Sequence, residues 1–162
     1  MLNHIFSSRQ IDAVMLASLW IQYVHPNKTI AAIGMLAGIL FTAVIIAGIL
    51  DFIFKSEKVS REIIYAAILL YLLVALMWAY LYSFLELVDP ASFNIDISQA
   101  DVNLAAFKYY SFVTITTLGY GDIIPITEVA KAFAVLEAVV GHLYFVVAVA
   151  WLLCMHVSSR SR

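Results

Sequence analysis

Three long stretches without charged side chains, apart from one glutamate, constrain this chain more than any other feature of its sequence. Residues 29–50 and 63–85 contain no Asp, Glu, Lys or Arg, and residues 132–155 contain only Glu137. A helix needs roughly 20 apolar residues to cross the hydrocarbon core of a bilayer, so each stretch is long enough to span it. Only 12% of the chain is charged, against about 25% in soluble domains. The sequence therefore predicts an all-α integral membrane protein.

Four membrane segments are predicted, at residues 11–24, 29–54, 62–87 and 129–156. The first is the weakest, because it is short and contains Asp12, Ser18 and Gln22. Basic residues lie between the second and third segments and at the end of the chain, and the positive-inside rule places both in the cytoplasm. The acidic residues of 86–101 then lie outside, where they are expected to attract cations. A cytoplasmic N-terminus requires that the first segment spans the membrane; if it lies in the interface instead, the N-terminus is outside.

A short motif, TTLGYGD at residues 116–122, separates the last two segments. A Thr-hydrophobe-Gly-Tyr-Gly loop can line a narrow pore with backbone carbonyl oxygens, which replace the hydration shell of K⁺. Glycines at alternate positions can adopt a positive φ, which a stack of such carbonyls requires. Non-helical backbone at membrane depth is tolerated only where protein or water shields it. The motif therefore indicates a pore loop.

From residue 61 to residue 156 the chain resembles the potassium channel pore-loop family. That family has an outer helix, an acidic loop, a short pore helix, a filter and an inner helix, and this sequence contains each part in that order. The resemblance implies a pore domain at 57–157, preceded by a membrane helix pair within 1–56 and followed by a cytoplasmic tail at 158–162. Within the pore domain it implies an outer helix at 62–87, a pore helix at 104–116, a filter at 117–121 and an inner helix at 129–156.

The resemblance also implies the assembly and the function. The motif occurs once in the chain, so a central pore needs several copies, and the family forms homotetramers with closed symmetry. The expected function is passive, K⁺-selective conduction across the cell membrane, with K⁺ as the transported ion and the lipid bilayer as the surroundings.

The resemblance assigns ion coordination to backbone atoms of the filter. Dehydrated K⁺ is expected to contact carbonyls of Thr117, Leu118, Gly119, Tyr120 and Gly121. Leu118 stands where valine is commoner, but the ion contacts its carbonyl and not its side chain, so K⁺ selectivity is expected to persist.

Four further residues are expected to support the filter. The Tyr120 ring should pack against Tyr109 and Tyr110 of the pore helix, Thr116 lies at the end of that helix, and Asp122 caps the outer end of the filter. In some relatives a pore-helix glutamate pairs with this aspartate. Val113 occupies the matching position here, so that pairing is absent.

The inner helix is expected to line a cavity and to contain a gate. Gly141 matches the hinge glycine of the family, although close helix packing by a small residue explains it equally well. His142, Phe145 and Val149 share one stripe of the helix, which by the resemblance faces the cavity. Protonation of His142 would oppose K⁺, so acid block is one hypothesis; a neutral, water-bonded histidine is the other.

Glu137 is an ionisable residue within a membrane segment, and such residues usually face protein or water. It lies one turn before Gly141 and is expected to hydrogen-bond to the pore helix through Thr114. A structural role is favoured over a role in gating.

Other functional classes fit the sequence less well. No ladder of arginines indicates a voltage sensor, no basic cluster indicates nucleic-acid binding, and no catalytic or metal-ligand spacing indicates an enzyme. A transporter subunit would carry several pore-like loops. The alternatives that stay open are a weakly selective monovalent cation channel and a non-conducting membrane scaffold or accessory subunit.

Overall fold

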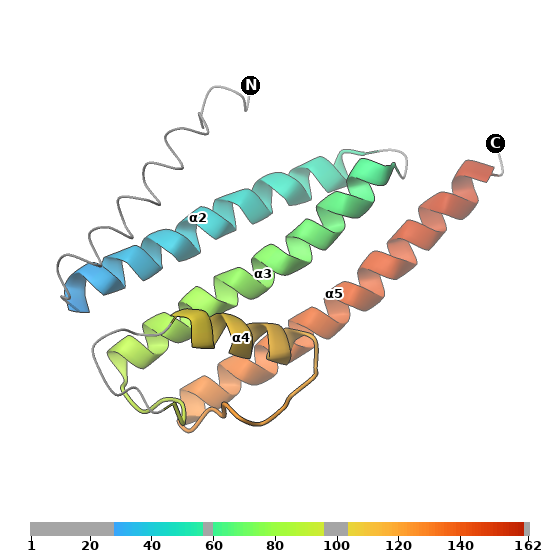
Figure 1. Ribbon diagram of the computed structural model, residues 1–162. Coiled ribbons are helices and arrows are strands. Elements are labelled where there is room, and N and C mark those ends of the chain that lie inside the picture. The colour runs from blue at the N-terminus through green and yellow to red at the C-terminus, as the bar shows by residue number, and fades with distance from the viewer. Residues whose placement is uncertain (1–27, 57–59, 96–103, 161–162) are drawn as a thin grey trace.

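The computed structural model describes residues 28–56, 60–95 and 104–160, with side chains as far as Trp151. It contains four helices: α2 (Lys28–Phe54), α3 (Arg61–Val88), α4 (Leu104–Ile115) and α5 (Glu128–Arg160) (Figure 1). Helices α2, α3 and α5 are long and apolar enough to cross a membrane. The weak first segment predicted at 11–24 lies outside the described residues.

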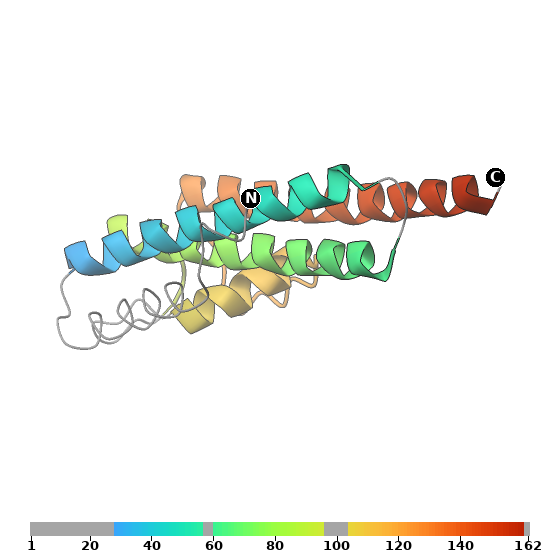
Figure 2. The same cartoon turned by 90° about the horizontal axis from the view of Figure 1, so that it is seen from above.

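The three long helices run roughly along one direction, and α4 lies to one side of them (Figure 2). Helices α2 and α3 are antiparallel neighbours, and α5 runs opposite to α3 (Figure 1). The end of α2, the start of α3 and the end of α5 therefore lie toward the same side. The basic residues Lys55, Arg61 and Arg160 lie at or next to these three helix ends, as the positive-inside rule requires of the cytoplasmic side.

Helix α3 is the central helix of this arrangement. It contacts α2, α4 and α5, whereas α2 contacts α3 alone among the described helices. From Ala75 to Glu86, the buried side chains of α3 recur at intervals of three and four residues, as one face of a helix requires; they include Trp78 and Tyr82. The outer helix thus supports the short helix and the last helix on the side away from α2.

Each helix end lies within one residue of the predicted end, except for the end of α5. Helix α4 ends at Ile115, so Thr116 lies just outside it. Helix α5 continues to Arg160, and residues 158–160, predicted as a tail, are helical. The residues after Gly141 include neither glycine nor proline, so no strong helix breaker stops α5 earlier.

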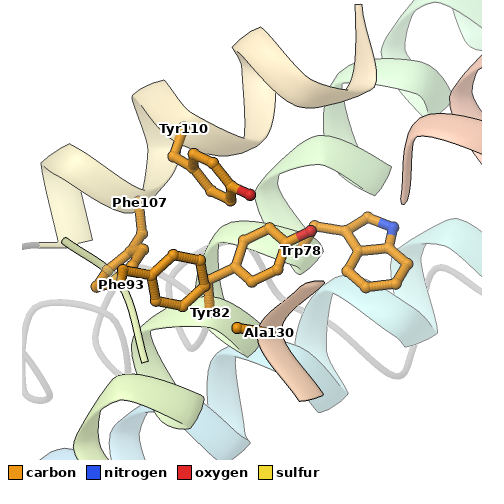
Figure 3. Close-up of a cluster of buried hydrophobic side chains, with 6 residues drawn as sticks. All are labelled: Trp78, Tyr82, Phe93, Phe107, Tyr110 and Ala130. Atoms are coloured by element: carbon orange, nitrogen blue, oxygen red, sulfur yellow. The ribbon is translucent and has the colours of Figure 1, made fainter. Parts of the chain in front are cut away.

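A cluster of aromatic rings holds α4 against α3 and the start of α5. Tyr82 lies edge-to-face on Tyr110, with ring centroids 5.0 Å apart, and Phe93 lies in the same way on Phe107 at 5.1 Å. Edge-to-face pairs of this kind add about 0.5–1.5 kcal/mol beyond the burial of their surface. The cluster, shown in Figure 3, consists of Trp78, Tyr82, Phe93, Phe107, Tyr110 and Ala130.

Candidate functional site

Helix α4 ends in a cap that leads directly into the segment 117–121. The Leu118 N–H donates to the Val113 carbonyl, and the Thr117 N–H donates to the Thr114 carbonyl, both at 2.9 Å. These two bonds form a Schellman motif, in which the residue after the helix is left-handed and is usually glycine. Here that residue is Thr117, with φ of 58°. A β-branched residue seldom adopts this conformation, and holding it there costs about 1–3 kcal/mol.

The backbone of the segment 117–121 alternates in hand. Positive φ recurs at Thr117, Gly119 (57°) and Gly121 (79°), and not at Leu118 or Tyr120. Within the described part of the chain, no hydrogen bond reaches the carbonyl oxygens of these five residues. All five residues are exposed in the single chain, so their carbonyl oxygens are open to the surroundings. The segment therefore presents consecutive carbonyl oxygens that accept no hydrogen bond from the described residues.

The side chains of this segment are uncovered in the single chain. Leu118 is 56% exposed and Tyr120 is 67% exposed. The Tyr120 ring stacks on Tyr109 of α4, with centroids 6.5 Å apart and planes 7° apart. This is the packing expected from the sequence. Tyr110, expected beside it, lies instead in the buried aromatic cluster, because its position on α4 faces α3.

Asp122 follows the segment and has a partner that the sequence did not indicate. The Tyr109 hydroxyl hydrogen-bonds to the Asp122 carboxyl and holds the pKa of that carboxyl below its ordinary value. The same bond raises the pKa of the Tyr109 phenol. Tyr109 thus supports both the ring of Tyr120 and the carboxylate of Asp122. Val113, at the position of the absent glutamate, contributes its carbonyl to the helix cap instead.

The segment after Asp122 is held by the loop that follows α3. The Asn94 N–H donates to the Ile124 carbonyl at 3.1 Å. The Asn94 side chain accepts from the Ile124 N–H at 2.5 Å and donates to the Asp122 carbonyl at 3.3 Å. Phe93 and Pro125 form a β-bridge beside these bonds. Sequence reasoning missed Asn94, because an asparagine in a polar loop carries no signal of its partner.

Glu86 fixes this loop from the end of α3. Its two carboxylate oxygens accept from the Ala91 N–H at 2.9 Å and the Phe93 N–H at 3.1 Å. The side chain is buried, with 6% of its surface exposed. The expectation that Glu86 belongs to a solvated acidic mouth is therefore wrong. The residue types in this loop gave no signal of the contact, because it depends on how the loop turns back over the end of α3.

Glu137 of α5 is fully buried and contacts both other helices. Tyr82 of α3 donates its hydroxyl to Oε2 at 2.6 Å, and the Oγ of Ser111 in α4 lies 2.5 Å from Oε1. The predicted bond to the pore helix exists, but Thr114 is the wrong partner. Ser111 lies one turn earlier on the buried face of α4, whereas Thr114 is only half-buried.

Gly141 lies where α5 meets the end of α4. A Cβ atom at this position would lie 2.5 Å from the Ile115 carbonyl oxygen, so no other residue fits without a shift of the backbone. Tyr71 of α3 donates to the same carbonyl at 2.9 Å. Its ring stacks on Tyr144, whose hydroxyl donates to the Ala67 carbonyl at 2.6 Å. Gly141 is thus a close-contact position; a hinge at Gly141 stays a prediction.

The three residues of the predicted cavity stripe lie on an uncovered part of α5. His142 is exposed in the single chain, as are Phe145 (66%) and Val149 (41%). Other apolar residues of α5, including Leu143 and Val146, are exposed as well. The chain alone therefore leaves most of this helix without a protein partner.

The sequence model of the ion channel family matches residues 66–155, which is more than half of the chain. The chain belongs to the ion channel family. The matched channel domain begins within α3, includes α4 and the segment 116–127, and ends within α5. With its three apolar helices, the chain is a multi-pass membrane protein. The ion channel family is not an enzyme family. No curated protein and no solved structure matches the chain.

Proposed function

We propose that this channel conducts K⁺ selectively through the segment 117–121. The observation that carries the proposal is the run of five successive residues whose carbonyl oxygens receive no hydrogen bond from the described chain. A cation that sheds its water needs such a run of oxygens to replace its hydration shell. The coordinating atoms are then carbonyl oxygens of Thr117, Leu118, Gly119, Tyr120 and Gly121. Ions in adjacent sites repel one another, which allows each to leave.

The proposal requires several copies of the chain around one axis. A single loop cannot surround an ion, and its free carbonyls cannot face lipid, because an unpaired backbone group in hydrocarbon costs several kcal/mol. The exposed faces of Leu118, Tyr120 and α5 are the surfaces that neighbouring copies would cover. A homotetramer with cyclic symmetry would surround the ion and would also cover these exposed faces, since a closed ring leaves no interface without a partner.

The short helix contributes an electrostatic term to this mechanism. The carboxyl end of a helix has a partial negative charge, which favours a cation nearby. In α4 this end immediately precedes Thr117. The Ile115 carbonyl at this end accepts from Tyr71, which fixes the direction of the last turn. In the tetramer, four such helix ends would stabilise a hydrated K⁺ below the filter.

Flux measurements on the purified full-length chain in liposomes test this function. With unequal K⁺ and Na⁺ on the two sides, the reversal potential should follow the K⁺ gradient. Gly119→Ala should abolish the K⁺ flux, because alanine is strained at the positive φ of this position. Gly48→Ala is the matched control, since a Cβ at Gly48 meets nothing within 4 Å and α2 lies away from the segment.

Each alternative has its own outcome in the same experiment. A reversal potential that responds equally to K⁺ and Na⁺ would identify a weakly selective cation channel. A folded oligomer without flux would identify a scaffold or accessory subunit. Chemical cross-linking that yields monomers alone would overturn the tetrameric pore.

A further inference from the structure

Three helices meet at the carboxyl group of Glu137, in what we call the Glu137 cluster (Tyr82, Ser111 and Glu137). Tyr82 comes from α3, Ser111 from α4 and Glu137 from α5, and each is fully buried. Both carboxyl oxygens have a hydroxyl partner at short distance. The Glu137 carboxyl group therefore joins all three helices of the channel domain.

The protons available to this cluster can be counted. A serine hydroxyl has one proton to donate and two lone pairs that accept. Ser111 Oγ lies 2.7 Å from the Ala75 carbonyl, which can only accept, so the serine proton belongs to that bond. The second short contact of Oγ is to Glu137 Oε1. Two oxygen atoms without a proton between them would repel each other at 2.5 Å. Oε1 of Glu137 must therefore be protonated and donate to Ser111 Oγ.

The other carboxyl oxygen agrees with this count. Tyr82 donates to Oε2, which is then the carbonyl oxygen of a carboxylic acid. The bonds form one directed chain, from the Tyr82 hydroxyl through the carboxyl group to Ser111 and on to the Ala75 carbonyl. Every hydroxyl in this series of hydrogen bonds donates once, and no buried side-chain polar atom in the described residues is left without a partner.

Among the side chains that the structure describes, none with a positive charge pairs with Glu137. The ion pairs of the described chain are Lys55–Asp51 and Lys131–Glu128, and neither involves Glu137. The other titratable groups near enough to interact with Glu137 are the phenols of Tyr71 on α3 and Tyr110 on α4. A buried carboxylate without a cation costs several kcal/mol. A neutral acid avoids this cost.

We propose that Glu137 is a neutral carboxylic acid that donates its proton to Ser111 and thereby acts as a positioning residue for the pore helix. Ser111 lies on the helix whose cap holds Thr117, and Glu137 lies one turn before the contact of Gly141 with Ile115. Helix α5 therefore holds α4 at two points, in its middle and at its end. This arrangement does not depend on which ion the channel conducts.

Infrared spectroscopy of the full-length chain, labelled with ¹³C at the glutamate carboxyl groups and reconstituted in lipid, tests the protonation state. At neutral pH the spectrum should contain the C=O band of a protonated, hydrogen-bonded carboxylic acid. Glu137→Gln should remove this band. Glu128→Gln is the matched control: Glu128 is an exposed glutamate of the same helix, paired with Lys131, and its removal should leave the band unchanged. Spectra with carboxylate bands alone would overturn the proposal.

A second set of variants separates this bond from a general packing role. Ser111→Ala should shift the acid band, because the acceptor of the Glu137 proton is lost, and packing alone would not move it. Glu137→Gln should keep the thermal stability of the oligomer, since its amide can donate to Ser111 and accept from Tyr82. Glu137→Leu should lower that stability, because the Tyr82 hydroxyl loses its acceptor and Ser111 loses the donor to its Oγ. An unshifted band in Ser111→Ala, or equal destabilisation by Gln and Leu, would overturn the proposed bond.

Discussion

Two buried glutamates, Glu86 and Glu137, lie in the same channel domain and are satisfied in different ways. Glu86 accepts two backbone N–H groups of the loop that follows α3. Glu137 meets two hydroxyls inside the helix bundle. The N–H groups can only donate, so both Glu86 oxygens must accept, and an ionised carboxylate suits them. Hydroxyls can donate or accept, so they also suit a carboxylic acid.

The comparison shows that the hydrogen-bonding groups around a buried glutamate decide which protonation state suits it and which part of the structure it holds. At Glu86 the carboxylate organises a loop, which in turn holds the backbone at Asp122 and Ile124 through Asn94. At Glu137 the acid joins three helices that are already formed. Glu86 therefore supports the segment 117–121 through the loop that follows α3, and Glu137 supports it through α4.

The same substitution should destabilise the protein at Glu86 and leave its stability nearly unchanged at Glu137, and this difference is the largest effect that we expect. In Glu86→Gln, the amide NH₂ would face one of the two loop N–H groups, which leaves a buried donor unpaired. An unpaired buried donor costs about 1–3 kcal/mol. Glu137→Gln should change the free energy of unfolding little. Denaturant unfolding of the two variants in detergent measures both values.

Equal free energies of unfolding for Glu86→Gln and Glu137→Gln would contradict the proposed difference between the two glutamates. Glu62→Gln provides a control for the substitution itself, since Glu62 is an exposed residue at the start of α3. Its free energy of unfolding should stay close to that of the unchanged chain.

Removal of one hydroxyl should have an intermediate effect on the inner site. Tyr82→Phe deletes the donor to Glu137 Oε2 and should lower the free energy of unfolding by about 0.5–1.5 kcal/mol. Tyr65→Phe is the control, because Tyr65 is 67% exposed on the same helix. Equal unfolding free energies for the two variants would show that Tyr82 contributes through its ring alone.

A third carboxyl group, Asp122, should respond to external pH with the smallest effect. Its pKa is held below the ordinary value, so its bond to Tyr109 is complete at neutral pH. The bond is lost as external pH falls through that lowered pKa, below about 3.9. Tyr109→Phe removes the bond, so acid sensitivity of the current should move to higher external pH. Bilayer recordings at stepped external pH measure this shift, and an unchanged pH midpoint would contradict it.

The sequence predicts the helices of this channel better than the contacts between them. Long apolar runs determine α2, α3 and α5, because a membrane span needs length and hydrophobicity only. The stacking of Tyr120 on Tyr109 was predicted from the resemblance of the motif at 116–122 to potassium channel pore loops. The choice of Ser111 over Thr114 as the partner of Glu137 does not, since both lie within one turn of the same helix. The helix face that meets α3 and α5 decides between them.

Two further features lay beyond a pattern in the sequence. The burial of Glu86 depends on how the loop at Ala91 and Phe93 turns back over the end of α3, which side-chain types alone do not specify. The left-handed conformation of Thr117 depends on the cap of α4, where the usual glycine is absent. In each case the backbone geometry of a neighbouring segment determines the outcome.

The central place of α3 has a mechanical consequence. Helix α2 covers one flank of α3, while α4 and α5 hold the opposite flank through Tyr71, Tyr82 and the Ala67 carbonyl. A helix gripped from both sides cannot roll about its axis without losing one set of neighbours. Beyond Tyr144, no side-chain hydrogen bond or ring contact among the described residues joins α5 to α3, so within the single chain the end of α5 is held less firmly than its start.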